Sequence, residues 1–284
     1  MPWLDYSGRL SSLKLVVFIA LFLPGAWTAA GLAAGTLGAE PLKEAIHQAG
    51  LWTFRFLLIA LAITPARQLL QWPRLILVRR MVGVAAFAYV MAHLALFAAD
   101  QMFDLGKVVS EIVLRFYLTI GFVALLGLAA LAATSTDGMI RRLGGRRWQR
   151  LHRLVYFIGL LGLVHYFIQS KIETYEPMIM GGCFAWLMGY RLIARRRRDR
   201  RVPLLAVAML GLSAATLTAL AEAIYFWLRN GVDPWRVLAV NVSLATGLRP
   251  GAVVLTAGIA VTAIAAARPL LKYLRAPRWR FGVT

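Results

Sequence analysis

Residues 148–167, WQRLHRLVYFIGLLGLVHYF, combine a basic start, two histidines and an apolar run that can cross a bilayer as a helix. Similar runs recur along the 284 residues, of which 60% are hydrophobic and only 15% charged. This composition excludes a soluble globular protein. The sequence therefore predicts an all-α fold, a polytopic transmembrane helical bundle of about eight spans, at 13–35, 51–70, 81–99, 116–135, 150–169, 177–194, 203–228 and 251–271.

The arginine block RRRRDRR at 195–201 divides the predicted spans into two groups. Six spans precede it and two follow. We therefore expect an N-terminal span in residues 1–44, a central domain in 45–201 and a C-terminal two-span extension in 202–284. The first run, SSLKLVVFIALFLPGAWTAAG (11–31), has features of a cleaved signal peptide. It continues past the usual length of such a peptide, which favours a first span that stays.

The distribution of positive charge predicts the orientation of the spans. If the N-terminus is cytoplasmic, 24 of the 32 Lys and Arg residues lie on the cytoplasmic side. This asymmetry follows the positive-inside rule and places both termini in the cytoplasm. The net charge of +20 is thus explained without nucleic acid. The block at 195–201 is most simply an anchor beside anionic membrane lipid.

Three histidines lie within the predicted spans. His93 is part of GVAAFAYVMAHLALF (83–97), and His152 and His165 belong to the run at 150–169. Imidazole is costly in hydrocarbon and survives there when it pairs with a polar group, carries protons or binds a metal. Neutral imidazole is also a common axial ligand of haem iron.

Depth indicates which histidines can share one iron. His93 lies about 20 Å beyond Arg80 along its helix, and His165 lies about 22 Å beyond Arg150 along its own. Both helices start from the cytoplasmic side, so the two rings reach one level in the periplasmic half. We expect a haem between them. The alternative for each histidine is a hydrogen bond to a neighbouring helix.

His152 lies near the cytoplasmic surface, two residues after Arg150. On one straight helix it would point roughly 140° away from His165. It therefore cannot serve the same iron, and we expect it to serve a second cofactor near the surface or electron entry.

Three further residues need an interpretation. Arg55 lies inside the second span at nearly the level of the histidine pair, where haem propionates could partner it; the alternative is that it snorkels to the interface. His47 is expected in a periplasmic loop without a special role. Cys183 is the only cysteine, so the chain can form neither an internal disulfide nor a thiolate metal cluster by itself.

Four stretches carry recognisable motifs: FRFLLIALAITPAR (54–67), VRRMVGVAAFAYVMAHL (78–94), RFYLTIG (115–121) and TSTDGMIRRLGGRRWQRLHRLVYFIGLLGLVHYF (134–167). The combination of T-S-T, L-G, W-x-x-L-H-x-x-x-Y and H-Y at these spacings resembles the MsrQ family. Its members are haem-binding membrane subunits of a periplasmic methionine sulfoxide reductase system, within the ferric-reductase-like transmembrane group. The resemblance covers roughly residues 45–195, and shorter members lack the last two spans.

The resemblance implies haem b and singles out the positions of His93, His152 and His165 as candidate iron ligands. It also implies a bacterial inner-membrane location and electron delivery to MsrP, a periplasmic molybdenum-cofactor protein that repairs oxidised proteins. The expected electron donors are the quinone pool or a cytoplasmic flavin reductase. Bound FMN is implied by the resemblance as well.

The residues themselves favour an electron relay whose catalytic site is on a partner. The chain has no room for a nicotinamide-binding domain and no G-x-G-x-x-G after a strand, so it cannot take hydride from NAD(P)H unaided. Two alternatives remain. One is a self-contained haem ferric or metal reductase, and the other is a haem-free proton-coupled transporter.

Overall fold

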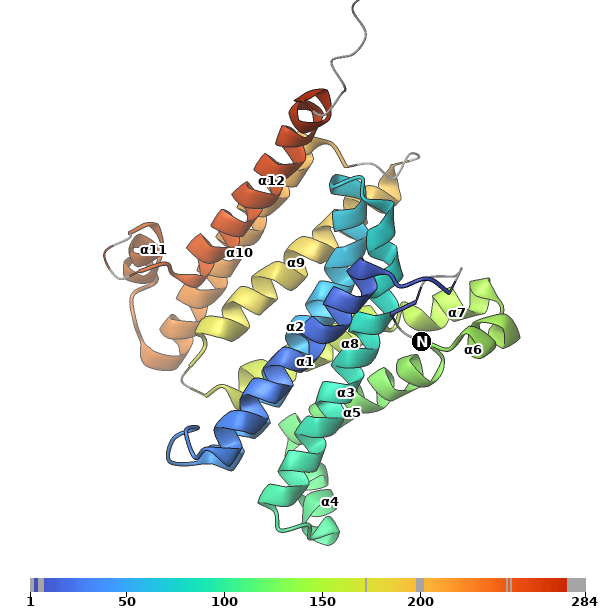
Figure 1. The fold of residues 1–284 in the computed structure, drawn as a ribbon. Coiled ribbons are helices and arrows are strands. Elements are labelled where there is room, and N and C mark those ends of the chain that lie inside the picture. Colours follow the sequence, from blue (N-terminus) through green and yellow to red (C-terminus); the bar gives the residue numbers. More distant parts are fainter. Residues whose placement is uncertain are drawn as a thin grey trace, which may run out of the picture. The chain divides into compact units, whose positions relative to one another are not determined.

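A computed structural model describes residues 3–4, 8–171, 173–197, 202–243, 245 and 247–274. Within these ranges the chain forms helices and no strand, apart from one isolated bridge between Leu4 and Leu10. The helices are α1 (Ser12–Ala33), α2 (Pro41–Leu69), η1 (Pro73–Leu75), α3 (Ile76–Asp100), α4 (Leu105–Leu114), α5 (Phe116–Ala133), α6 (Asp137–Leu143), α7 (Gly145–His152), α8 (Val155–Gln169), α9 (Tyr175–Arg196), α10 (Leu204–Asn230), α11 (Pro234–Val242) and α12 (Pro250–Leu274) (Figure 1).

The predicted all-α, multi-pass membrane fold is confirmed. In the described part of the chain, eight helical segments are long and apolar enough to cross a membrane, and they correspond to the eight predicted runs. The main difference is at α2, which begins at Pro41 rather than near residue 51. Its first ten residues are too polar for a hydropathy window but continue the same helix.

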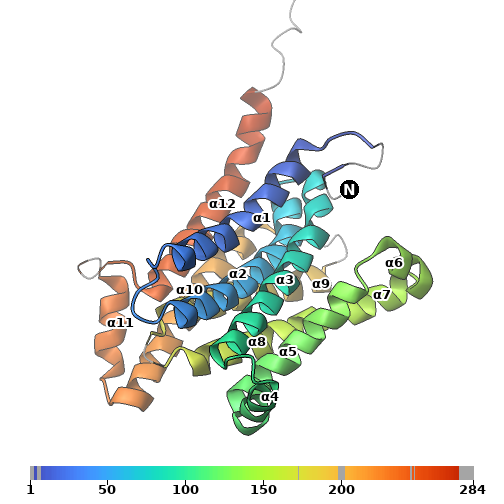
Figure 2. The ribbon, with the colours of Figure 1, turned by 60° about the horizontal axis from the view of Figure 1, so that its bottom comes forward.

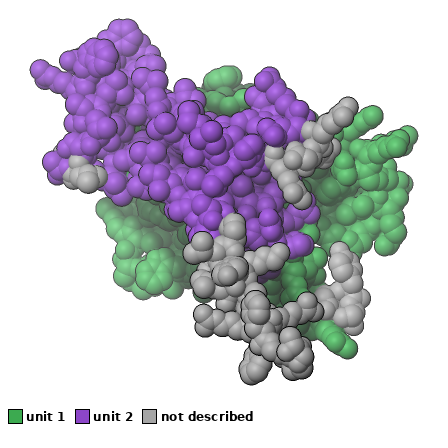
Figure 3. Space-filling view, turned by 90° about the horizontal axis from the view of Figure 1, so that it is seen from above, with its two compact units in different colours: residues 1–64, 74–177 green, residues 65–73, 178–284 purple. Residues whose placement is uncertain are grey.

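Two compact units divide the chain (Figure 3). Unit 1 holds residues 1–64 and 74–177, and unit 2 holds residues 65–73 and 178–284. The boundaries predicted from sequence, after residues 44 and 201, rest on charge and span number and stay a prediction.

In unit 1, α2 is the most buried span, with Phe54, Phe56 and Leu61 in its core. A glycine on another span lets two helices approach closely. A Cβ on Gly127 of α5 would lie 2.7 Å from Ile158 of α8, so only glycine fits there. Beyond α5, the short helices α6 and α7 form a hairpin (Figure 2).

The first span is tied to α3 by one tyrosine. The hydroxyl of Tyr89 donates to the carbonyl of Leu21 (2.9 Å) and accepts from the amide of Gly25 (2.7 Å). The hydroxyl therefore replaces the helical hydrogen bond between the carbonyl of Leu21 and the amide of Gly25. The neighbouring residue, Pro24, has no N–H to donate within the helix.

The run predicted as one span at 150–169 is two helices. Between α7 and α8 the amides of Arg153 and Leu154 bond to carbonyls three residues earlier, as in a 3₁₀ turn. The angle of roughly 140° between His152 and His165, which assumed one straight helix, therefore does not apply. That the two histidines lie at different positions in the unit is shown by their different contacts instead.

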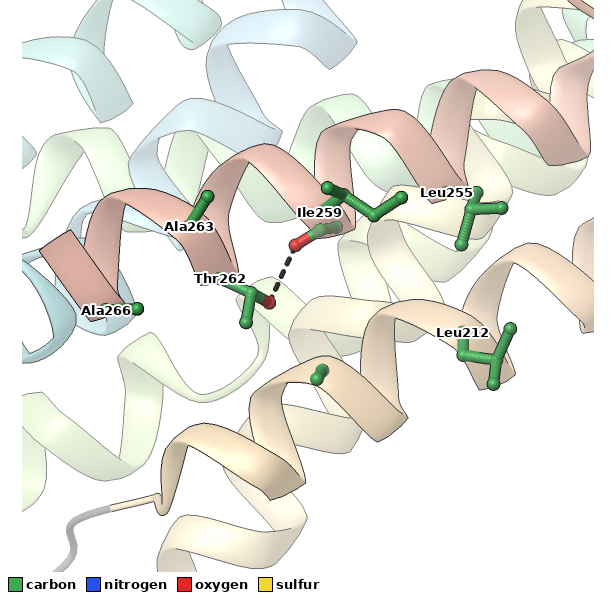
Figure 4. Close-up of a pocket in the computed structure, with 8 residues that line it drawn as sticks. Leu212, Leu255, Ile259, Thr262, Ala263 and Ala266 are labelled. Carbon is green, nitrogen blue, oxygen red and sulfur yellow. Dashed lines mark hydrogen bonds between the residues drawn. The ribbon is translucent and has the colours of Figure 1, made fainter.

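Unit 2 is centred on α10 and α12. Gly211 and Gly258 face each other, and a Cβ on either would come within 3.1 Å of the other's Cα. On one side of this contact the two helices leave a groove of about 270 Å³ (Figure 4), lined by the aliphatic and small side chains Ala208, Leu212, Leu255, Gly258, Ile259, Thr262, Ala263 and Ala266. This groove contains no ionisable group.

Candidate functional site

The structure brings together two of the predicted site residues in unit 1. The imidazole rings of His93, on α3, and His165, on α8, have centroids 6.4 Å apart, and their planes are nearly perpendicular at 89°. Sequence reasoning matched their depths by counting residues along two helices. The structure adds that the two rings are neighbours, contributed by two different helices of the unit.

Each ring is oriented by a backbone carbonyl of another helix. Nδ1 of His93 lies 2.8 Å from the carbonyl oxygen of Ile46 on α2, and Nδ1 of His165 lies 2.8 Å from that of Tyr117 on α5. A carbonyl can only accept, so each Nδ1 carries the proton and donates it. Both Nε2 atoms are then left with a free lone pair, the form that ligates a metal.

A glycine makes room for each ring. A Cβ on Gly50 would lie 3.0 Å from Nδ1 of His93, and a Cβ on Gly121 would lie 2.8 Å from Nδ1 of His165. In both cases the glycine follows the accepting carbonyl by four residues, one helical turn. The sequence analysis missed this repeated arrangement, although Gly121 ends the quoted motif RFYLTIG.

The spacing of the two rings fits one metal ion between them. Metal–imidazole bonds of about 2 Å on each side place the two ring centroids about 6.3 Å apart. No group of three or more His, Cys, Asp or Glu side chains suited to a metal occurs in the described part of the chain. A porphyrin supplies four nitrogens itself, so haem iron needs only these two protein ligands.

His152 has a different set of partners at the end of α7. Its Nδ1 lies 3.1 Å from the carbonyl oxygen of Trp148, and its Nε2 lies 3.3 Å from the hydroxyl of Ser135. Its ring stacks on Trp148 with centroids 3.9 Å apart, and the indole N–H donates to the carbonyl of Thr134. Among the described contacts of His152, none involves His93 or His165.

Arg55 has a partner that the sequence analysis did not consider. Its guanidinium donates to Oε1 of Glu176, at the start of α9, over 2.8 Å, and lies 4.8 Å from the ring centre of Trp52. The other oxygen of Glu176 accepts from the hydroxyl of Tyr166 at 3.0 Å. Tyr166 follows His165 in sequence, so this network includes the neighbouring residue on α8. Glu176 begins a span, where a hydropathy argument gives acids no role.

His47 lies in the second turn of α2 rather than in a loop. Helix α2 starts at Pro41, because the polar segment before the apolar run is also helical. The ring of His47 is 6.2 Å from that of Tyr166, centroid to centroid.

The chain resembles known proteins over most of the histidine-containing part. Residues 49–163 match the family described as ferric reductase like transmembrane component. A protein-methionine-sulfoxide reductase heme-binding subunit MsrQ from Rhodospirillum rubrum is 46% identical over 193 residues, which are 67% of this chain and 93% of the relative. The chain belongs to the MsrQ family.

Further members of the MsrQ family show the same similarity. The subunit from Caulobacter vibrioides is 43% identical over 183 residues, which are 64% of this chain and 87% of the relative. The one from Herminiimonas arsenicoxydans is 42% identical over 187 residues, 65% of this chain and 86% of the relative. No solved structure matches the chain significantly.

Unit 2 contains a buried polar cluster to which the sequence analysis gave no role. Glu222 of α10 is 2% exposed and forms an ion pair with Arg249, just before α12. Its other oxygen accepts from the side-chain amide of Asn241 on α11 at 2.7 Å. The amide oxygen of Asn241 accepts in turn from the backbone N–H of Gly251. The cluster therefore joins three helices of the C-terminal extension.

Proposed function

We propose that this chain is the haem-binding transmembrane subunit of a methionine sulfoxide reductase system. It carries electrons from quinol or a cytoplasmic flavin reductase to an MsrP-like periplasmic molybdoprotein, which repairs oxidised proteins. The observation that carries the proposal is the His93–His165 pair, with its 6.4 Å ring separation and both Nδ1 atoms bonded to carbonyls. Membership of the MsrQ family supports it, since its relatives are named heme-binding subunits.

In this proposal His93 and His165 would hold the iron of one b-type haem. The bound haem supplies a reversible one-electron carrier. The carbonyls of Ile46 and Tyr117 hold the two rings in the ligating tautomer and make Nε2 more basic. Arg55 would partner a propionate of the bound haem in this proposal. In the structure its charge is balanced by Glu176.

The orientation in the proposal follows the charge asymmetry. Both termini lie in the cytoplasm and the chain crosses the bacterial inner membrane. Helix α3 then runs outward, and His93 lies seven residues before its end at Asp100, about 10 Å from the periplasmic surface. A haem held by this pair would therefore lie near the side on which the proposed periplasmic partner docks.

His152 serves electron entry on the cytoplasmic side in this account, as a ligand of a second haem or a contact to flavin or quinol. Its contacts with Trp148 and Ser135 lie at the α5–α6 end of unit 1, away from the ring pair. His152→Ala is expected to keep the haem of the pair while slowing its reduction by the physiological donor. Complete loss of haem from a folded His152→Ala variant would contradict this role.

The experiment that tests the proposal is reoxidation of the purified, reduced protein. We expect rapid reoxidation by the matching MsrP and slow reoxidation by ferric chelates. The reverse order would favour a self-contained metal reductase, and purified protein without a haem spectrum would favour the proton-coupled transporter. Haem, FMN and quinone measured in the same sample test the FMN that the family resemblance implies.

A further inference from the structure

Helix α4 presents an apolar face that no described residue of unit 1 covers. The helix joins two spans, α3 and α5, and all but one of its apolar side chains share one side of the helix. Leu105, Val109 and Val113 line one outward face and are each at least 60% exposed. Val108, on the adjoining face, is buried against the unit. Lys107 and Glu111 occupy the opposite side, Ser110 lies at its edge, and Leu114 is exposed among them.

The chain turns at both ends of α4, so this helix is not a continuation of α3 or of α5. Met102 and Phe103 adopt positive φ angles of 54° and 58° after α3, and the extended residue Arg115 separates α4 from α5. These turns also place apolar side chains outward. Met102, Phe103 and Phe116 are each at least 70% exposed and extend the apolar face of α4 toward the spans on either side.

We propose that α4 is an interfacial helix whose apolar face lies in the lipid of the membrane surface. Its level is set by the chain, because α3 ends at Asp100 and α5 begins at Phe116, where two membrane spans reach the boundary of the hydrocarbon. Its charged side then faces the headgroups and water, where Lys107 can meet lipid phosphate.

Lipid explains this face better than a water-soluble protein partner does. Interfaces of transient complexes are about as polar as ordinary protein surface, whereas this face is aliphatic and aromatic throughout. A contiguous apolar face of this kind would be an aggregation site in water. Beside two spans it continues the lipid-facing surface of the bundle.

The position of α4 also bears on the histidine pair. The hydroxyl of Thr119 on α5 donates to the carbonyl of Ile112 on α4 over 2.6 Å, and the amide of Arg115 donates to the carbonyl of Glu111. These bonds join α4 to the first turn of α5, which contains the Tyr117 carbonyl that holds His165. A helix held in the membrane surface therefore fixes the support of that ring.

The test is site-directed spin labelling of the full chain in liposomes. Cys183 is the only cysteine, so Cys183→Ala gives a background for single cysteines at Val109 and Val113 on the apolar face and at Lys107 and Ser110 on the polar face. We expect labels at 109 and 113 to collide mainly with oxygen, which concentrates in lipid. Labels at 107 and 110 should collide mainly with a water-soluble nickel chelate, giving an oxygen-to-nickel ratio several-fold lower.

Equal nickel accessibility at all four positions would overturn the proposal. Nickel access at 109 and 113 that disappears when the periplasmic partner is added would instead identify a protein-docking surface and would also overturn it. The haem spectrum of each labelled variant checks that the protein is folded. If the label at 109 disturbs the fold, positions 105 and 113 report on the same face.

Discussion

His93 and His165 face each other with ring centroids 6.4 Å apart, and each donates its Nδ1 proton to a carbonyl one helical turn before a glycine. The two halves of the site are thus built alike, α2 supporting the ring from α3 and α5 supporting the ring from α8. This arrangement fixes ring position and tautomer before any metal binds.

The glycines beside the rings are expected to be as important as the carbonyls. Gly121→Ala places a methyl group 2.8 Å from Nδ1 of His165 and forces the ring away from the Tyr117 carbonyl. We expect haem affinity to fall by about 10- to 100-fold, the usual effect of losing a support of a metal ligand. Haem titration of the purified variant measures this. Gly83→Ala on α3 is the matched control, because no atom lies within 4 Å of its added Cβ.

Arg55 and Glu176 can be separated by removing one charge at a time. If Arg55 partners a haem propionate, Arg55→Gln should weaken haem retention, whereas Glu176→Gln leaves the guanidinium available and should retain haem. Haem loss to apomyoglobin from each variant measures the difference. Equal haem loss from both variants would mean that Arg55 acts only through its ion pair with Glu176.

The ion pair between buried Glu222 and half-buried Arg249 is predicted to stabilise the C-terminal extension without affecting haem. Glu222→Leu leaves the Arg249 guanidinium without its carboxylate partner, and we expect a loss of about 3–5 kcal/mol in the free energy of unfolding. The double variant Glu222→Leu, Arg249→Leu should recover most of it. Thermal unfolding measures stability, and unchanged haem content in the folded fraction serves as the control.

The stability of helix α6 in unit 1 is expected to depend on pH only under acidic conditions. The Arg80 guanidinium, by hydrogen bond and charge, holds the pKa of the Asp137 carboxyl below its usual value of 3.8. A lowered pKa means that the pair contributes stability above the ordinary pKa and loses it as the pH falls through the lowered one. Hydrogen exchange in α6 relative to a reference peptide should therefore be constant between about pH 5 and 8. Faster exchange within that window would contradict the pairing.

The sequence was sufficient for the fold class, the eight spans and the depth match of the two histidines, because hydropathy and helical rise act on local sequence. It could not reveal Glu176 or the Ile46 and Tyr117 carbonyls, since these meet the site from helices far away in the chain. The break between α7 and α8 was also hidden, because a 3₁₀ turn leaves the apolar run intact.

The polar start of α2 shows a second limit. A hydropathy window begins a span where the apolar run begins, so it placed His47 in a loop. The helix starts at Pro41, six residues earlier than His47. Short helices outside the spans, such as the ten-residue α4, escape the same window because they are shorter than a membrane span.

The most direct test of the central claim is the haem content of His93→Ala and His165→Ala, purified in parallel with His47→Ala as the control. The account predicts that either variant of the pair loses most of its haem, because the iron would lose one of its two protein ligands, while the control keeps it. Full haem occupancy in a folded His93→Ala or His165→Ala variant would contradict the claim that these two residues hold one haem between them.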